Sequence, residues 1–160
     1  MNAVVSKPVA HAGQWLTFRI GAQLYAAQLA EVSEVIRDGS LTPVPGASPD
    51  MLGVRQLRGR IVPVMDGRLR LGLAQTDPAP DPVSVRIVLL VQGGQTFGLK
   101  VDAIGELVDS TGIDIAPPPT GRAARADDPV SGVLAWQGGF IALLDARRLC
   151  RMDAEDADAA

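Results

Sequence analysis

Histidine and cysteine are almost absent from this chain of 160 residues, and their scarcity restricts its chemistry. The one histidine, His11, lies in an aperiodic segment of small and polar residues, so a Ser–His or Cys–His pair has no rigid support. The one cysteine, Cys150, excludes an internal disulfide and favours a reducing compartment. We interpret its thiol as structural, on a short closing helix. No group of histidines, cysteines and carboxylates has the spacing of a metal site.

Carboxylates are the remaining candidates for catalysis, since paired acidic side chains perform general acid–base chemistry in hydrolases. The acidic residues near the expected strands are Glu31, Glu34, Asp102, Glu106 and Asp109. We interpret them as solvated or ion-paired surface groups, because charged side chains are seldom buried. The sequence therefore predicts a protein that is not an enzyme and that needs no cofactor or metal.

Aromatic residues and long apolar runs are scarce as well. Only 4% of the chain is aromatic, so its core must consist mainly of Val, Leu, Ile and Ala. No apolar run approaches the roughly 20 residues of a membrane span. The N-terminus also lacks the basic-then-apolar pattern of a signal peptide. We therefore expect a cytoplasmic protein.

The charge balance bears on nucleic acid as a partner. A formal net charge of −3 argues against it for the chain as a whole. One local cluster keeps a phosphate-binding face open as an alternative to a solvated strand face: Arg55, Arg58, Arg60, Arg68 and Arg70. No aromatic residue is interleaved with these arginines, so base stacking has no platform.

Glycine and proline, in contrast, are abundant, with 17 and 12 residues. Such a turn-rich chain favours many short strands over long helices. We expect flexible tails at residues 1–13 and 151–160, the second of them acidic. Residues 14–150 form one domain, in which a linker at 74–82 separates two subdomains. The first spans about 14–73 plus a closing C-terminal segment, and the second about 83–150.

The two halves of this domain repeat each other. A shift of 72 positions aligns residues 16–35 with 88–107, and a shift of 79 positions aligns 53–68 with 132–147. Turn glycines and core aliphatic residues coincide in both alignments. The chain therefore consists of two copies of one small β unit of about five strands, each too small to be stable alone.

The repeat separates structural residues from candidates for function. Asp66 and Asp145 coincide after the last strand of each unit, so we interpret them as turn or cap residues. Arg58 stands at the turn before Gly59 in a predicted hairpin, and its counterpart is Gln137. Because the second copy does without an arginine there, Arg58 is the better candidate for a functional residue.

The sequence resembles the CheW-like domain family of bacterial chemotaxis coupling proteins. The blocks that carry the resemblance are residues 18–25, 32–36, 44–45, 53–64, 101–108 and 145–149. The resemblance implies an all-β fold with short helices, in which two five-stranded SH3-like β-barrel subdomains pack around a shared hydrophobic core. Gly67 and the pair Ala26-Ala27 replace bulkier family residues, and we expect them to loosen the first barrel locally.

The resemblance also implies two protein partners for a non-catalytic adaptor. These are the regulatory domain of a CheA-type histidine kinase and the cytoplasmic hairpin tip of a chemoreceptor, which together place the protein at the inner face of the membrane in receptor arrays. Arg58 matches the family arginine implicated in receptor binding, Glu34 its acidic partner and Val32 a nearby apolar contact. Val54 and Leu57 complete the expected receptor-binding set. No residue is assigned to the kinase interface.

Two other functions remain as alternatives. One is a CheW-like adaptor of a different chemosensory pathway, such as type IV pilus control or surface sensing. The other is an SH3-like module that binds nucleic acid or peptides through the arginine cluster.

Overall fold

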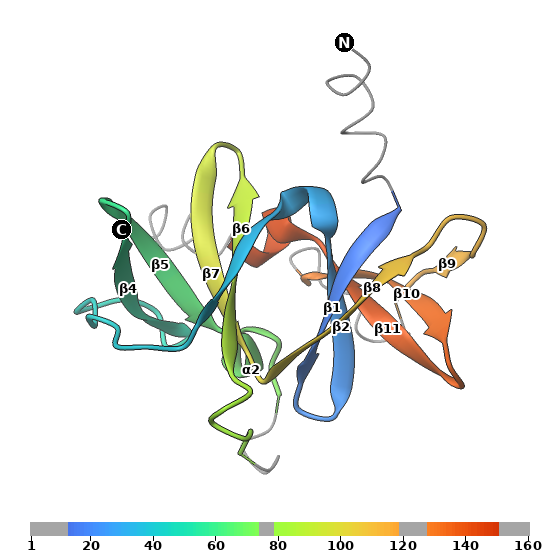
Figure 1. Ribbon diagram of the computed structural model, residues 1–160, viewed down its shortest axis with the longest axis horizontal. Coiled ribbons are helices and arrows are strands. Elements are labelled where there is room, and N and C mark those ends of the chain that lie inside the picture. Colours follow the sequence, from blue (N-terminus) through green and yellow to red (C-terminus); the bar gives the residue numbers. More distant parts are fainter. Residues whose placement is uncertain (1–12, 74–78, 119–127, 151–160) are drawn as a thin grey trace.

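Strands dominate the computed structural model, which describes residues 13–73, 79–118 and 128–150 (Figure 1). In chain order the elements are β1 (Gln14–Ile20), β2 (Gln23–Gln28), the short 3-10 helix η1 (Leu29–Glu31), β3 (Val32–Arg37), β4 (Met51–Leu57), β5 (Arg60–Asp66), α2 (Gly67–Arg70), β6 (Arg86–Gln92), β7 (Gln95–Val101), β8 (Ala103–Asp109), β9 (Ile115–Ala116), β10 (Val130–Trp136) and β11 (Gly139–Leu144). Residues 146–150 form a further helical segment after β11. The predicted all-β fold with short helices is confirmed.

The strands form two sheets that lie side by side in Figure 1. Sheet A has six strands in the order β8-β1-β2-β11-β10-β9, and sheet B has five in the order β3-β6-β7-β5-β4. The repeat equates β1 and β2 with β6 and β7, and β3, β4 and β5 with β8, β10 and β11. Each sheet therefore takes two strands from one half of the chain and its other strands from the other half.

This exchange corrects the predicted division of the domain. The expected subdomains, 14–73 and 83–150, do not correspond to the sheets, because β1 and β2 leave the first half to pair with β8 and β11. In return, β3 and β5 pair with β6 and β7 of the second half. Sheet A also has a sixth strand, β9, whose counterpart in sheet B is a single bridge between Thr42 and Val54. The described pairings leave both sheets open, so neither is a closed barrel.

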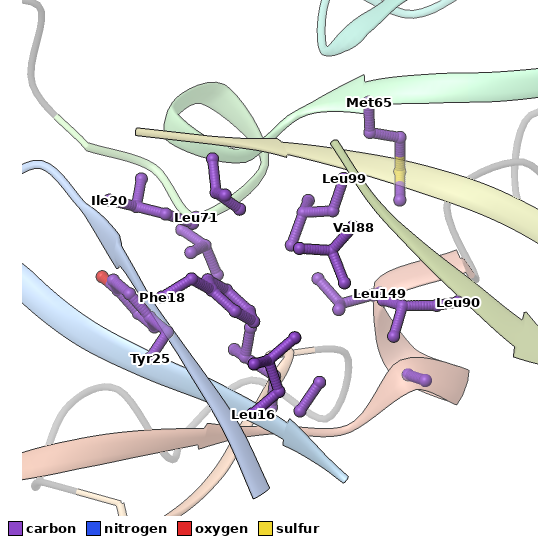
Figure 2. Packing of buried hydrophobic residues seen from close by; sticks show 14 of the residues in the cluster. Leu16, Phe18, Ile20, Tyr25, Met65, Leu71, Val88, Leu90, Leu99 and Leu149 are labelled. Carbon is purple, nitrogen blue, oxygen red and sulfur yellow. The ribbon is translucent and has the colours of Figure 1, made fainter. Parts of the chain in front are cut away.

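A hydrophobic cluster between the sheets forms the predicted shared core (Figure 2). Alternate side chains of a strand point to opposite faces, so β1 and β6 each contribute every second residue to it. Phe18 of β1, Leu90 of β6 and Leu149 of the final helical segment are all 0% exposed. Removing such side chains from water stabilises the fold by about 1.5–3 kcal/mol each. The shared cluster therefore joins both halves of the chain in one folding unit.

The opposite faces of β1 and β6 fill smaller clusters inside each subdomain. Sheet A encloses Trp15, Ala26, Val108, Leu134, Ile141 and Leu143, and sheet B encloses Val62, Val64, Ile87 and Leu89. The nearly continuous apolar run at residues 83–91 predicts a strand that is buried on both faces, and β6 is covered on both faces at residues 87–90. The buried run is shorter than expected, since Val83 and Val91 at its ends are 79% and 38% exposed.

The predicted caps and turns are largely confirmed. The carboxylate of Asp66 accepts hydrogen bonds from the first backbone amides of α2, and Asp145 does the same for the final helical segment. In the sequence, Pro49 directly after Ser48 predicts a short helical turn at residues 48–52, with Ser48 as its N-cap, and this prediction is wrong. Residues 49–50 form a turn closed by the Met51 amide and the Ser48 carbonyl (3.0 Å), and β4 begins at Met51.

Gly67 does not loosen the fold as expected, because it permits a close approach. A Cβ atom at this buried position would lie 2.6 Å from the carbonyl oxygen of Lys100. Ala26 is buried in the cluster inside sheet A, and Ala27 is buried in the shared core. Of the predicted linker and tails, residues 1–12, 74–78 and 151–160 lie outside the described part of the chain.

The strand exchange predicts that neither half of the chain folds by itself. We expect fragments 1–78 and 79–160 to lack a cooperative thermal transition when separate, because every sheet needs strands from both. Mixed in equal amounts, they should recover strand signal and a cooperative transition, measured by circular dichroism. A monomeric half that melts cooperatively alone would contradict the exchange.

Candidate interaction site at the β4–β5 turn

The hairpin of β4 and β5 presents Arg58 at its turn. Its two turn residues, Arg58 and Gly59, have φ of 52° and 78°, the left-handed pair that closes a tight hairpin. Gln137 and Gly138 occupy the same position between β10 and β11, with φ of 47° and 79°. The unusual backbone thus belongs to the repeat. Only the arginine side chain is particular to the first copy.

Arg58 forms a two-pronged ion pair with Glu34. Its Nη1 donates to Oε2 of the carboxylate, and its Nη2 donates to Oε1 at 3.0 Å. The Arg58 side chain is 69% exposed and that of Glu34 28%. A fork of this kind fixes the plane of the guanidinium while leaving its outer edge open to a partner. The predicted pairing of these two residues is therefore present in the structure.

The ion pair lowers the pKa of Glu34 below its ordinary value of 4.5. The largest cause is the hydrogen bond from Arg58; desolvation opposes it, and the guanidinium charge adds a smaller lowering. A carboxylate whose pKa is lowered by folding stabilises the fold above its unfolded pKa and loses this contribution as the pH falls through the folded pKa. The pair is thus intact at neutral pH and breaks only in acid. Because both groups are solvated, its contribution to stability is small.

A second arginine bridges the same two edges of sheet B. β3 and β4 are its outermost strands, and Nη1 of Arg55 on β4 donates to the carbonyl oxygen of Arg37 on β3 at 2.6 Å. Together with Arg58–Glu34, this bond links edges that share no described strand pairing. Side chains therefore close sheet B where backbone pairing does not.

The other predicted site residues lie in different environments. Val32 begins β3 and packs against the shared core, whereas Leu57, which precedes Arg58, packs against the cluster inside sheet B. Val54 is half-buried and pairs with Thr42 and Pro63. The structure thus brings Glu34 and Arg58 into contact, whereas Val32, Val54 and Leu57 contribute to packing and strand pairing.

The predicted arginine cluster is dispersed by the fold. Arg68 is bound to Asp102, with its Nη2 2.7 Å from Oδ2, and these side chains are only 21% and 12% exposed. Arg70 donates to the carbonyl oxygens of Arg148 and Leu149, at the end of the final helical segment. Since Arg58 is held by Glu34, these arginines do not form the single phosphate-binding face that the sequence left open.

The carboxylates weighed for catalysis are not gathered either. Asp102 holds Arg68 and the Gly21 amide, while Asp109 accepts from the Thr111 amide. Within residues 13–73, 79–118 and 128–150, no group of three or more histidine, cysteine or acidic residues could hold a metal ion. In the same part of the chain, no helix is long and apolar enough to cross a membrane.

The geometry defines a small protein of two interlocked β subdomains with a prominent ion pair at a hairpin turn. Comparison with known proteins identifies the family to which this class of structure belongs. The CheW-like domain family matches residues 14–158, and the chain belongs to it.

Individual relatives cover most of the chain. It is 32% identical over 132 residues to chemotaxis protein CheW of Rhizobium meliloti (strain 1021), covering 81% of this chain and 82% of that protein. It is 31% identical over 130 residues to protein FrzA of Myxococcus xanthus, covering 81% and 79%. The crystal structure of scaffolding protein TtCheW from Thermoanaerobacter tengcongensis superposes with a TM-score of 0.74 at 29% identity, over 86% of each chain.

Removal of the Arg58–Glu34 pair and of the Arg68–Asp102 pair should affect stability differently. Arg58→Asn is expected to leave the melting temperature unchanged or slightly higher, because Asn-Gly suits this turn and the lost pair is solvated. Asp102→Ala should lower the free energy of unfolding by about 1–3 kcal/mol, because it deprives the half-buried Arg68 and the Gly21 amide of their acceptor. Denaturant titration of both variants tests this, and a marked loss of stability in Arg58→Asn would show that Arg58 is structural.

The Glu34 pKa offers a direct measure of the ion pair in solution. Carboxyl carbon shifts followed by NMR against pH should place it below 4.5 in the native chain. Arg58→Gln should raise it, because the hydrogen bond and the positive charge are both lost. An unchanged Glu34 pKa in this variant would mean that the pair does not form in solution.

Proposed function

We propose that this chain is a non-catalytic adaptor that couples chemoreceptor cytoplasmic tips to a CheA-type histidine kinase. Membership of the CheW-like domain family supports this function, as does the likeness to a protein described as a scaffold. The observation that carries the proposal is the exposed Arg58 guanidinium, held in place by Glu34 at a turn whose counterpart has glutamine.

The receptor would meet a surface that is already organised. A helical hairpin tip offers carboxylates and helix-end carbonyls, and a guanidinium with a fixed plane can bind either with little loss of side-chain entropy. Glu34 therefore acts as a positioning residue for Arg58. Val32, Val54 and Leu57 complete the proposed receptor-binding set as apolar neighbours along β3 and β4.

The kinase would bind through its regulatory domain, at a surface to which we assign no residues. In a complete assembly the adaptor is cytoplasmic and reaches the inner face of the membrane only through receptors. Its role is to hold two proteins in register, and it contributes no chemical step.

A different chemosensory pathway is the second candidate, and the similarity to FrzA favours keeping it. Both candidates require the same adaptor surfaces, so identification of the kinase recovered with the tagged chain from its own cell extract separates them. Nucleic-acid binding has less support, since the structure disperses the arginine cluster on which that alternative depended.

Receptor binding is the test of Arg58. We expect Arg58→Glu to weaken capture of receptor-containing membranes at least about tenfold, because it replaces a donor fork with a charge that also repels Glu34. The matched control is Arg60→Glu, which makes the same charge change two residues away, at an exposed position on β5.

Melting curves and kinase capture complete the experiment. Arg58→Glu should keep a cooperative transition and bind kinase like the native chain. An equal loss of receptor binding in Arg58→Glu and Arg60→Glu would show that only the general charge of this surface matters. Undiminished receptor binding in a folded Arg58→Glu variant would show that Arg58 is not part of the site.

A further inference from the structure

Two arginines stand directly opposite each other near one end of sheet B. Arg37 at the end of β3 pairs in register with Arg86 at the start of β6. Directly opposed residues of antiparallel strands have their Cβ atoms about 4.5–5.5 Å apart on the same face, so two positive charges here destabilise the pairing. The fold does not require them. Their counterparts in sheet A, Asp109 and Gln14, form the equivalent pair without a positive charge.

No carboxylate among the described residues forms an ion pair with either arginine. Arg86 donates through Nη1 to the carbonyl oxygens of Val83 (2.8 Å) and Val85 (2.9 Å), which are neutral. The nearby Asp38 is paired with Lys100 at 3.3 Å. The side chain of Arg37 has no hydrogen bond or ion pair within the described ranges.

A third guanidinium joins them from β4. Arg55 donates to the Arg37 carbonyl oxygen, and its guanidinium lies against Gly39, where a Cβ would be only 3.2 Å from Nη1. Arg55 thus places a third positive group beside the backbone of Arg37, and in the described structure only backbone carbonyls accept hydrogen bonds from Arg55 and Arg86. Such groups keep donors available for an anion.

A hollow of about 310 Å³ lies beside the opposed pair. Its lining consists of Arg37, Asp38, Pro82, Val83, Val85 and Arg86. Val83 is 79% exposed, a large fraction for an aliphatic side chain at the rim of a hollow. Guanidinium groups and an aliphatic surface therefore meet at one place.

We propose that this hollow, with Arg37 and Arg86 as its anion-binding groups, docks a short acidic segment of a partner protein. Carboxylates of the segment bind the two guanidiniums, and an adjacent aliphatic residue of the segment covers Val83. The site is distinct from the Arg58–Glu34 pair in its residues, so it holds whether or not the proposed receptor site does.

Chemistry favours a peptide over nucleic acid or a membrane. No aromatic side chain lines the hollow, so bases have nothing to stack on. The two arginines that line the hollow match one or two carboxylates and not a run of phosphates, and Asp38 in the same lining further limits the negative charge that the hollow accepts. Anionic membranes recruit clusters of four to eight basic residues, more than this corner has.

A display library of random decapeptides, panned on the full-length protein at low salt, tests the proposal. Bound sequences should be enriched in Asp or Glu next to Leu, Ile or Val. A synthetic consensus peptide should then bind the native chain and lose at least about fivefold in affinity with Arg37→Gln, measured by fluorescence anisotropy. Arg60→Gln is the matched control, because it removes an exposed arginine of sheet B outside the hollow.

Each other outcome decides against the site. No acidic enrichment overturns it, as does equal weakening by Arg37→Gln and Arg60→Gln. A single-stranded 20-mer of DNA or phosphatidylserine vesicles that bind more tightly than the peptide, with the same dependence on Arg37, would assign the corner to those ligands instead.

Stability supplies an independent readout. Arg37→Gln should leave the melting temperature unchanged or raise it, because it relieves the repulsion from Arg86 and breaks no side-chain bond. Arg37→Gln that melts clearly lower would make the arginine structural and overturn its role as a binding group. Val83→Ser, which alters only the exposed rim, should weaken the peptide without changing the melting temperature.

Discussion

The exchange of strands between the two halves of the chain is the constraint on which the rest of this structure depends. β1 and β2 complete the sheet of the second half, and β6 and β7 complete that of the first. Because the middle of β1 and of β6 is then covered on both faces, both faces are buried there, and the shared core forms from the faces that are turned toward the other sheet. A chain tied together in this way keeps the β4–β5 turn in a fixed position relative to β3, which a site made from both requires.

Much of this architecture could be predicted, because the repeat and the turn residues are local signals. The β4–β5 hairpin, the caps at Asp66 and Asp145 and the apolar run of β6 all follow from local spacing alone. The exchange could not be predicted, because two contiguous subdomains and two exchanged subdomains use the same strands with the same apolar patterns. Only the pairing between strands that are distant in the sequence distinguishes the two arrangements, and the repeat gives no information about this pairing.

The candidate site likewise has features that could be predicted from the sequence and features that could not. Arg58 could be singled out because its counterpart is glutamine, and its pairing with Glu34 was implied by family resemblance. The bond from Arg55 to the Arg37 carbonyl, and the burial of Arg68 with Asp102, depend on which strands meet and left no mark in the sequence. Arginines that are alike within one stretch of the chain therefore have separate tasks: two secure the fold, one bridges an edge and two are exposed to solvent.

The internal repeat provides a physical criterion for functional residues that does not depend on comparison with homologous proteins. Two copies of one unit satisfy the same backbone requirements, so a residue that departs from its counterpart is a candidate for function unless it makes buried contacts of its own, as Gly67 and Asp102 do. Arg58, whose counterpart in the repeat is Gln137, and Arg37, whose counterpart is Asp109, both meet this criterion. Both are exposed residues of sheet B. Arg37 meets the criterion more strongly, because its charge faces that of Arg86 and destabilises the strand pair. A destabilising arrangement that the other copy avoids is better explained by binding than by folding.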